Sequence, residues 1–270
     1  MITLAVVPST TPGNSPEALE SLCREIGKLV DDTVVSAHPA TYAELASGLE
    51  KDRVQYAWMS PALLVLTDEN TRITPLLTAV RNDQVEFRSV MFVDAASPYF
   101  ALEQLRGKTV AWVDTTSAAG YLFPRVHLAT RGIDPTTHFG RELFLHSHAE
   151  VVRAVADGRA DVGATYAEPR GDGPLRRAGF LDTAPDHPMR ILEWTRAIPH
   201  DVIAGHGLLP KPALRLFSNA ILTLAERDDG RALLQAAFHA ERFATTPRNA
   251  LRPLWEHVRL ARKHGLLPHL

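Results

Sequence analysis

Two short stretches of the chain place anion-binding side chains directly after predicted buried strands. Thr116 and Ser117 follow the buried strand predicted at 109–113, and His148 follows the strand predicted at 142–145. Each stretch then opens a predicted helix, whose first N–H groups lack partners and carry a partial positive charge. Hydroxyl, imidazole and backbone N–H groups together can hold a small oxyanion. The alternatives are structural, with Ser117 as an ordinary helix cap and His148 as a surface histidine.

His148 belongs to a segment that occurs twice in the chain. Residues 41–60 read TYAELASGLEKDRVQYAWMS, and residues 147–166 read SHAEVVRAVADGRADVGATY, at a constant offset of 106 without gaps. Each copy begins with a capping box, in which Glu follows Ser or Thr by three residues, and continues as a short helix and an apolar strand. Tyr42 takes the place of His148 in the first copy. The repeat predicts two similar lobes that close on a small ligand, although helix–strand units also look alike by chance.

Strands and helices alternate along the rest of the chain. The run 2–7 is typical of a parallel strand covered on both faces, and residues 17–30 have helical spacing. Further strands are predicted at 33–37, 54–58, 73–81, 87–93, 109–113 and 142–145, with 73–81 and 87–93 forming a pair. Residues 167–182 are predicted as a loop, and the pattern is helical from 210 onward. In the mostly parallel sheets that this order predicts, ligands bind beyond the carboxyl ends of strands, which directs attention to Ser60, Ser117, His148 and Glu168.

Composition narrows the classes of function. The chain has 270 residues, a formal net charge of -2, 45% hydrophobic and 22% charged residues, which are ordinary values for a globular protein with ample core. The near-neutral charge and the lack of a basic stripe argue against nucleic acid as a partner. No apolar run reaches the roughly 18 residues that span a membrane, so no membrane insertion is predicted.

Motifs for metal binding or catalysis are weak in this sequence. His146 and His148 form an H-x-H pair, but no Asp, Glu or Cys stands near them in a recognised ligand pattern. The single cysteine, Cys23, excludes an internal disulfide. No nucleophile elbow, phosphate-binding loop or metalloprotease signature occurs. We therefore predict no metal, no cofactor and no catalytic residue.

Longer stretches resemble the phosphonate-binding family of periplasmic solute-binding proteins. The resemblance is carried by LRGKTVAWVDTTSAAGYLFPRVHLATRGIDP, HSHAEVVRAVADGRADVGATYAE, VQYAWMSPA, VEFRSVMFVDAASP and ERFATTPRNALRPLWEHVRLARKHGLL, which together span nearly the whole chain. It implies the type 2 periplasmic-binding fold, an α/β clamshell of two lobes, each a mostly parallel sheet flanked by helices. It also implies reversible binding of a small oxyanion rather than catalysis.

The resemblance further implies ligand-binding residues at matched positions. Tyr42 matches the tyrosine that opens a first-lobe helix, Ser117 the first hydroxyl of the phosphonate-cradling loop, and His148 the histidine at the next helix start. Glu168 and Asp201 match two carboxylates that hold the ammonium group in aminoalkylphosphonate binders. We therefore expect an anionic or zwitterionic ligand, with a preference for zwitterions.

Three positions depart from the family pattern. Ala118 and Ala119 stand where the loop usually supplies further hydroxyls, and Phe87 replaces a common tyrosine. Each hydrogen bond to a charged group is worth about 1.5–3 kcal/mol, so these losses should weaken phosphonate binding. Trp58 and Phe87 are candidate walls of the ligand cleft, although such aromatic residues more often belong to the core.

The sequence therefore predicts a two-lobed solute-binding protein. Residues 1–95 and 190–270 are assigned to the first lobe and residues 96–189 to the second, with hinges near 94–97 and 189–193. The expected function is capture of a small anionic or zwitterionic solute for an ABC permease. The alternatives are an intracellular ligand-sensing domain and a cytosolic enzyme on the same fold.

The expected location depends on how the chain begins. Its first residues form a strand and show no secretory signal, so the sequence as written predicts a cytoplasmic protein. Removal of a signal before this numbering began would instead place the protein in the periplasm or outside the cell. A solute-binding function for an importer requires the second case.

Overall fold

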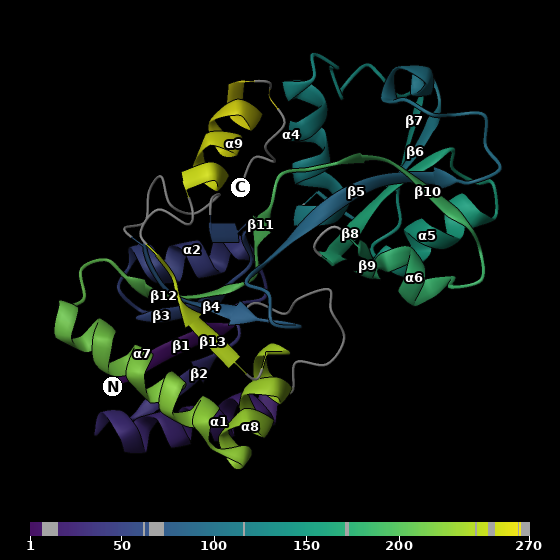
Figure 1. Cartoon of the computed structure of the whole chain (residues 1–270). Coiled ribbons are helices and arrows are strands. Elements are labelled where there is room, and N and C mark those ends of the chain that lie inside the picture. The colour runs from purple at the N-terminus through teal and green to yellow at the C-terminus, as the bar shows by residue number, and fades with distance from the viewer. Residues whose placement is uncertain are drawn as a thin grey trace. The chain divides into compact units, whose positions relative to one another are not determined.

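The chain forms two compact α/β units. The structure is a computed structural model that describes residues 1–6, 16–61, 63–64, 73–115, 117–170, 173–240, 242–247, 252–263 and 265. The first unit comprises residues 1–86 and 199–251, and the second comprises residues 87–198 and 252–269. Each unit has its own sheet (Figure 1). Each unit also has its own buried hydrophobic residues.

The first unit is built on a six-stranded sheet in the order β13-β4-β12-β3-β1-β2. Its strands are β1 (Ile2–Val6), β2 (Val34–Ala37), β3 (Tyr56–Met59), β4 (Ile73–Val80), β12 (Val202–His206) and β13 (Arg242–Thr245). Strand β1 runs parallel to β2 and β3, whereas β12 runs antiparallel to both β3 and β4. The helices of this unit are α1 (Pro16–Val30), α2 (Tyr42–Glu50), α7 (Lys211–Glu226) and α8 (Asp228–Phe238).

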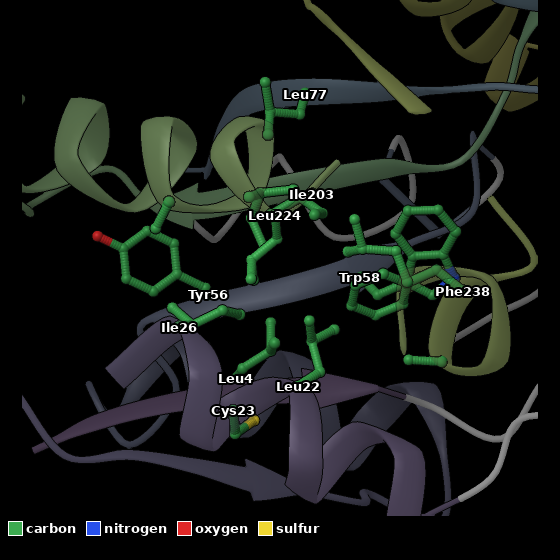
Figure 2. Packing of buried hydrophobic residues seen from close by; sticks show 14 of the residues in the cluster. Leu4, Leu22, Cys23, Ile26, Tyr56, Trp58, Leu77, Ile203, Leu224 and Phe238 are labelled. Carbon is green, nitrogen blue, oxygen red and sulfur yellow. The ribbon is translucent and has the colours of Figure 1, made fainter. Parts of the chain in front are cut away.

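Helical periodicity explains the core of the first unit. The apolar residues of α1 recur every three or four positions, so Leu22 and Ile26 are fully buried together with Leu4 of β1 (Figure 2). Tyr56 of β3 stacks on Phe217 of α7 with ring centroids 3.6 Å apart. Each such buried side chain contributes about 1.5–3 kcal/mol by leaving water. This core fixes the helices against the sheet.

The second unit contains a sheet in the order β10-β5-β8-β6-β7, with β9 paired to β8 and β11 to β5. Its strands are β5 (Glu86–Asp94), β6 (Thr109–Trp112), β7 (Arg141–Phe144), β8 (Val162–Arg170), β9 (Gly173–Ala178), β10 (Met189–Trp194) and β11 (Ile198–Pro199). Its helices are η1 (Leu102–Leu105), η2 (Ala118–Leu122), α4 (Phe123–Thr130), α5 (His148–Ala156), α6 (Gly179–Thr183) and α9 (Arg252–Lys263). None of the helices among the described residues is long and apolar enough to cross a membrane.

The two sheets repeat one arrangement. In the first sheet β1 lies between β2 and β3 and runs parallel to both, and in the second sheet β6 lies between β7 and β8 in the same way. Strand β12 pairs antiparallel with β3, and β5 pairs antiparallel with β8. The two copies of the sequence repeat fold as α2 with β3 and as α5 with β8. Equivalent segments therefore take equivalent places in the two units.

The predicted capping boxes form only in part. The hydroxyls of Thr41 and Ser147 each accept the N–H three residues on, at 3.1 Å in both cases. The carboxylate of Glu44 accepts from the N–H of Ala40 rather than from the cap residue, and Glu150 pairs with Arg153. The hydroxyl half of the motif is thus enough to start both helices.

Three predictions about strands and their partners are wrong. Strands β4 and β5 belong to different sheets instead of forming a pair. Residues 167–182 are not a loop, because β8 continues to Arg170 and β9 pairs antiparallel with it. Strand β10 does not return the chain to the first unit, because it pairs with β5 in the second sheet. Alternation and apolarity mark strands, but they carry no information about partners.

The chain passes between the units at positions other than the predicted hinges near 94–97 and 189–193. The first crossing lies at 86/87 and the return lies at 198/199. Residues 87–95 and 190–198 therefore belong to the second unit, where the sequence analysis had assigned them to the first. Helix α9 also belongs to the second unit, in which it packs on α4.

Candidate functional site

The loops that follow β6 and β7 are hydrogen-bonded to each other. These strands are parallel neighbours, with Trp112 opposite Phe144 at their carboxyl ends. Beyond the strands, the N–H of Leu145 donates to the carbonyl of Trp112 at 3.0 Å, and the N–H of His146 donates to the carbonyl of Val113 at 2.8 Å. Since one loop leads to Ser117 and the other to His148, the sheet brings these two predicted residues to the same edge.

Ser117 caps a helix that begins with a π-helical turn. Its Oγ accepts the N–H of Gly120 at 3.1 Å, and its carbonyl accepts the N–H of Leu122 at 2.9 Å. π-Helical turns are rare and concentrate at functional sites. A hydroxyl has one proton and two lone pairs, so Ser117 retains its proton for another acceptor while it caps η2.

Gly120 is required by this local geometry. A Cβ at this position would lie 2.3 Å from Cγ2 of Val113 and 2.9 Å from Oγ of Ser117. Only glycine allows the backbone of η2 to approach the end of β6 so closely. The Ser117 cap therefore depends on the residue three positions later.

His148 is the first residue of α5, and its ring is held by two residues of β8. Its Nδ1 lies 3.0 Å from Oγ1 of Thr165, and its ring packs edge-on against Tyr166 with centroids 5.0 Å apart. Burial lowers the pKa of His148 to about 4, although the charge of Asp114 opposes this effect. At neutral pH the imidazole of His148 is therefore a neutral group.

A face of the sheet carries further polar groups beside η2. Ser89 of β5 lies opposite Tyr166 of β8, so their side chains share one face of the sheet. Alternation along each strand adds Phe87 and Glu168 to this face. The Ser89 hydroxyl donates to the carbonyl of Ala119 at 2.6 Å, which ties η2 to the same face.

Glu168 lies beside charged residues of β9 and α6. Its side chain is 3% exposed, and Arg177 of β9 is its cross-strand neighbour. The guanidinium of Arg177 lies over the Tyr166 ring and its Nε donates to Asp182 at 2.7 Å, while the Tyr166 hydroxyl donates to Asp182 at 2.6 Å. Burial and the hydrogen bond to Asp182 raise the pKa of Tyr166 to about 12, so this phenol stays neutral. The ligand contact of Glu168 stays a prediction.

Asp201, the second predicted acid, already binds a cation of its own unit. Its carboxylate accepts from Nη2 of Arg81 at 2.7 Å. The same guanidinium donates to the carbonyls of Phe238 and His239 at the end of α8. Arg81 therefore balances the charge of Asp201 and binds the carbonyl end of a helix.

Trp58, Ser60 and Tyr42 are the other residues of the first unit that were predicted to bind the ligand. Trp58 is 7% exposed and stacks on Phe238 in the hydrophobic core (Figure 2). Ser60 caps the turn that follows β3, with its Oγ accepting the N–H of Leu63 at 3.2 Å. Tyr42 is the first residue of α2. The ligand contacts of all three residues stay predictions.

The remaining predicted residues are Ala118 and Ala119 of η2, Phe87 of β5, and Thr116. Ala118 and Ala119 form the first turn of η2, and Ala119 is 4% exposed. Phe87 is partly buried, and Thr116 lies outside the described residues. Ser89, Thr165 and Arg81 also contribute to these contacts but were not predicted from the sequence. A hydroxyl inside an otherwise apolar strand is the only signal for the first two, and such residues are also common in ordinary cores.

Solved structures share this fold over almost their whole length. XAC2383 from Xanthomonas citri, bound to chloride ion, aligns with a TM-score of 0.78 at 20% identity, covering 98% of each chain. PhnD1 from Prochlorococcus marinus, in complex with methylphosphonate, aligns with a TM-score of 0.67 at 18% identity, also covering 98% of each chain. These likenesses confirm the predicted type 2 periplasmic-binding fold.

The chain belongs to the phosphonate-binding family of ABC-transporter substrate-binding proteins. Residues 4–249 match the family model for the ABC transporter, phosphonate, periplasmic substrate-binding protein, which confirms the resemblance seen in the sequence. A curated relative, the phosphate-import protein PhnD of Mycolicibacterium smegmatis, is 24% identical over 178 residues. That stretch covers 61% of this chain and 54% of the relative, so the chain matches about half the length of that protein.

Proposed function

We propose that this protein reversibly binds a small phosphonate-like oxyanion and delivers it to an ABC permease outside the cytoplasm. The observation that carries the proposal is the pairing of the two loops after β6 and β7, which brings Ser117 and His148 to one edge of the sheet. Each residue stands at the start of a helix, where unbonded N–H groups favour negative charge. Membership of the family supports the transport function.

Neutral donors would hold the anion in this site. Ser117 retains a hydroxyl proton, because the N–H of Gly120 occupies only a lone pair of its oxygen. If the Thr165 hydroxyl donates to Nδ1 of His148, the ring carries its proton on Nε2 and presents it to the ligand. Glu168 would then attract a cationic group on the ligand, and Tyr42 and Ser60 would add contacts from the first unit.

Calorimetry with two single variants tests the anion site. Ser117→Ala and His148→Ala should each weaken binding of methylphosphonate or inorganic phosphate by about 1–3 kcal/mol, because each removes a donor to a charged ligand. His187→Ala is a matched control, since this histidine pairs with Asp94, the last residue of β5, and is not among the predicted ligand-binding residues. The control should bind as the wild type does.

Native mass spectrometry of freshly purified protein identifies a ligand that the cell supplies. A co-purified phosphonate, phosphate or amino-phosphonate would support the proposal. Unchanged affinity in both Ser117→Ala and His148→Ala would show that the anion lies elsewhere. Chemical conversion of a bound ligand would favour an enzyme on this fold instead of a transport component.

A further inference from the structure

Ser89 makes three hydrogen bonds from a position with no solvent exposure. Its N–H donates to Oγ1 of Thr195 at 2.9 Å, and its carbonyl accepts the N–H of Thr195 at the same distance. Its hydroxyl reaches across to η2 and donates to the carbonyl of Ala119 at 2.6 Å. A buried hydroxyl without a partner is costly, so this bond fixes both groups that it joins.

The bond to Ala119 determines how the next peptide group is oriented. The carbonyl of Ala119 and the N–H of Gly120 belong to one planar trans peptide and point in opposite directions. Ser89 holds the carbonyl, and Oγ of Ser117 accepts the N–H at 3.1 Å. Two serine hydroxyls, which come from different parts of the chain, therefore hold the two ends of one peptide group.

We infer that Ser89 is a positioning residue for anion recognition, which acts through the Ala119–Gly120 peptide on Ser117. With the N–H of Gly120 aimed at Ser117, a lone pair of Oγ is occupied and the hydroxyl proton must point elsewhere. That proton is then available to the ligand. The inference rests on the proposed function, because it gives Ser117 the task of donating to the anion.

A double-mutant cycle with calorimetry measures this coupling. With methylphosphonate and inorganic phosphate as probes, Ser89→Ala should weaken binding about tenfold, the loss expected for a misdirected hydrogen bond. In the Ser117→Ala background, the same change should have less than about a twofold effect, because the residue through which Ser89 acts is gone. Additive losses in the cycle would overturn the inference.

Ser218→Ala is a matched control for the loss of a buried serine. Ser218 lies in α7 of the first unit and is 9% exposed, and its Oγ also donates to a backbone carbonyl, that of Leu214, at 2.8 Å. This variant should lower the thermal midpoint as Ser89→Ala does but keep the wild-type affinity. If Ser89→Ala does not fold, Ser89→Cys keeps a weak donor and should show a smaller loss of affinity.

Amide hydrogen exchange separates this inference from the proposed function. Exchange of the Gly120 N–H should be faster in Ser89→Ala than in the wild type and unchanged in Ser218→Ala, with or without ligand. Equal protection of Gly120 in the wild type and Ser89→Ala would overturn the positioning of the peptide. Failure of the wild type to bind either probe would overturn the proposed function, while the exchange of Gly120 would still decide whether Ser89 holds the peptide.

Discussion

At the scale of single residues, the environment of His148 decides what the site can do. A histidine at a helix start is usually considered as a positive group, but packing against Thr165 and Tyr166 favours the neutral ring. A neutral ring donates from one nitrogen and accepts at the other, and the contact with Thr165 at Nδ1 leaves Nε2 for any further partner. Gly179 supports this arrangement, because a Cβ there would lie 2.0 Å from Oγ1 of Thr165.

The depressed pKa of His148 makes the stability of the protein depend on pH. Between its ordinary value of 6.5 and about 4, the unfolded chain binds a proton at this residue that the folded protein does not bind. Stability should therefore fall as pH decreases through this window, by about 3 kcal/mol at most. The free energy of urea unfolding, compared between the wild type and His148→Gln, isolates this term. Parallel pH profiles for the two proteins would contradict the neutral histidine.

The two predicted acids should have different effects on selectivity. Glu168→Gln removes the carboxylate proposed to attract a cationic group on the ligand, so it should lower the affinity for 2-aminoethylphosphonate relative to methylphosphonate by about tenfold. Asp201→Asn should leave that ratio nearly unchanged, because Arg81 already balances Asp201. It should instead destabilise the protein by about 1–3 kcal/mol through the uncompensated guanidinium. Calorimetry and urea unfolding of both variants measure these effects, and a larger selectivity change in Asp201→Asn would reverse the assignment.

At the scale of secondary structure, the π-helical turn η2 should tolerate substitution poorly, because its backbone packs closely against the end of β6. Gly120→Ala places a Cβ 2.3 Å from Val113, and the contact involves a valine that the strand holds firmly. The backbone of η2 must move, which should lower the thermal midpoint and weaken anion binding at least tenfold. Ala129→Gly, in α4 beyond η2, is a control that lowers helix stability without this clash. Wild-type affinity in Gly120→Ala would show that η2 does not contact the ligand.

Helices and strands were easier to predict from the sequence than the strands with which they pair. Helix α1 and strands β1 and β6 follow from local periodicity, and Ser117 and His148 follow from the rule that sites lie beyond the carboxyl ends of parallel strands. Strand β5 pairs antiparallel with β8 and β10, and these contacts join segments that are far apart in sequence. The β8–β9 hairpin forms because β8 continues past its apolar residues, which the apolar pattern alone does not indicate. Arg81 escaped prediction for the same reason, because its partner Asp201 lies in a distant segment.

At the scale of the whole molecule, the two units share a sheet order and each has a helix at the matching position, after β2 in the first unit and after β7 in the second. Helix α2 follows Thr41 in the first unit, and α5 follows Ser147 in the second. If residues of both units bind the anion, inorganic phosphate or methylphosphonate should slow amide exchange in both helix starts and in η2. Exchange measured by mass spectrometry on the full chain tests this, with the α7 segment of the first unit as an internal reference. Protection confined to the second unit would remove Tyr42 and Ser60 from the site.

The position of β12 has a consequence for how the protein is made. This strand lies between β3 and β4, so the first sheet cannot close until the ribosome has produced Val202–His206. In the second sheet the corresponding antiparallel strand is β5, which precedes β6, β7 and β8 in the chain. The nascent second sheet can therefore assemble as it emerges, while β3 and β4 wait with unpaired edges. During synthesis the earlier-made strands should be the later to fold, and those waiting edges are where a chaperone would be needed most.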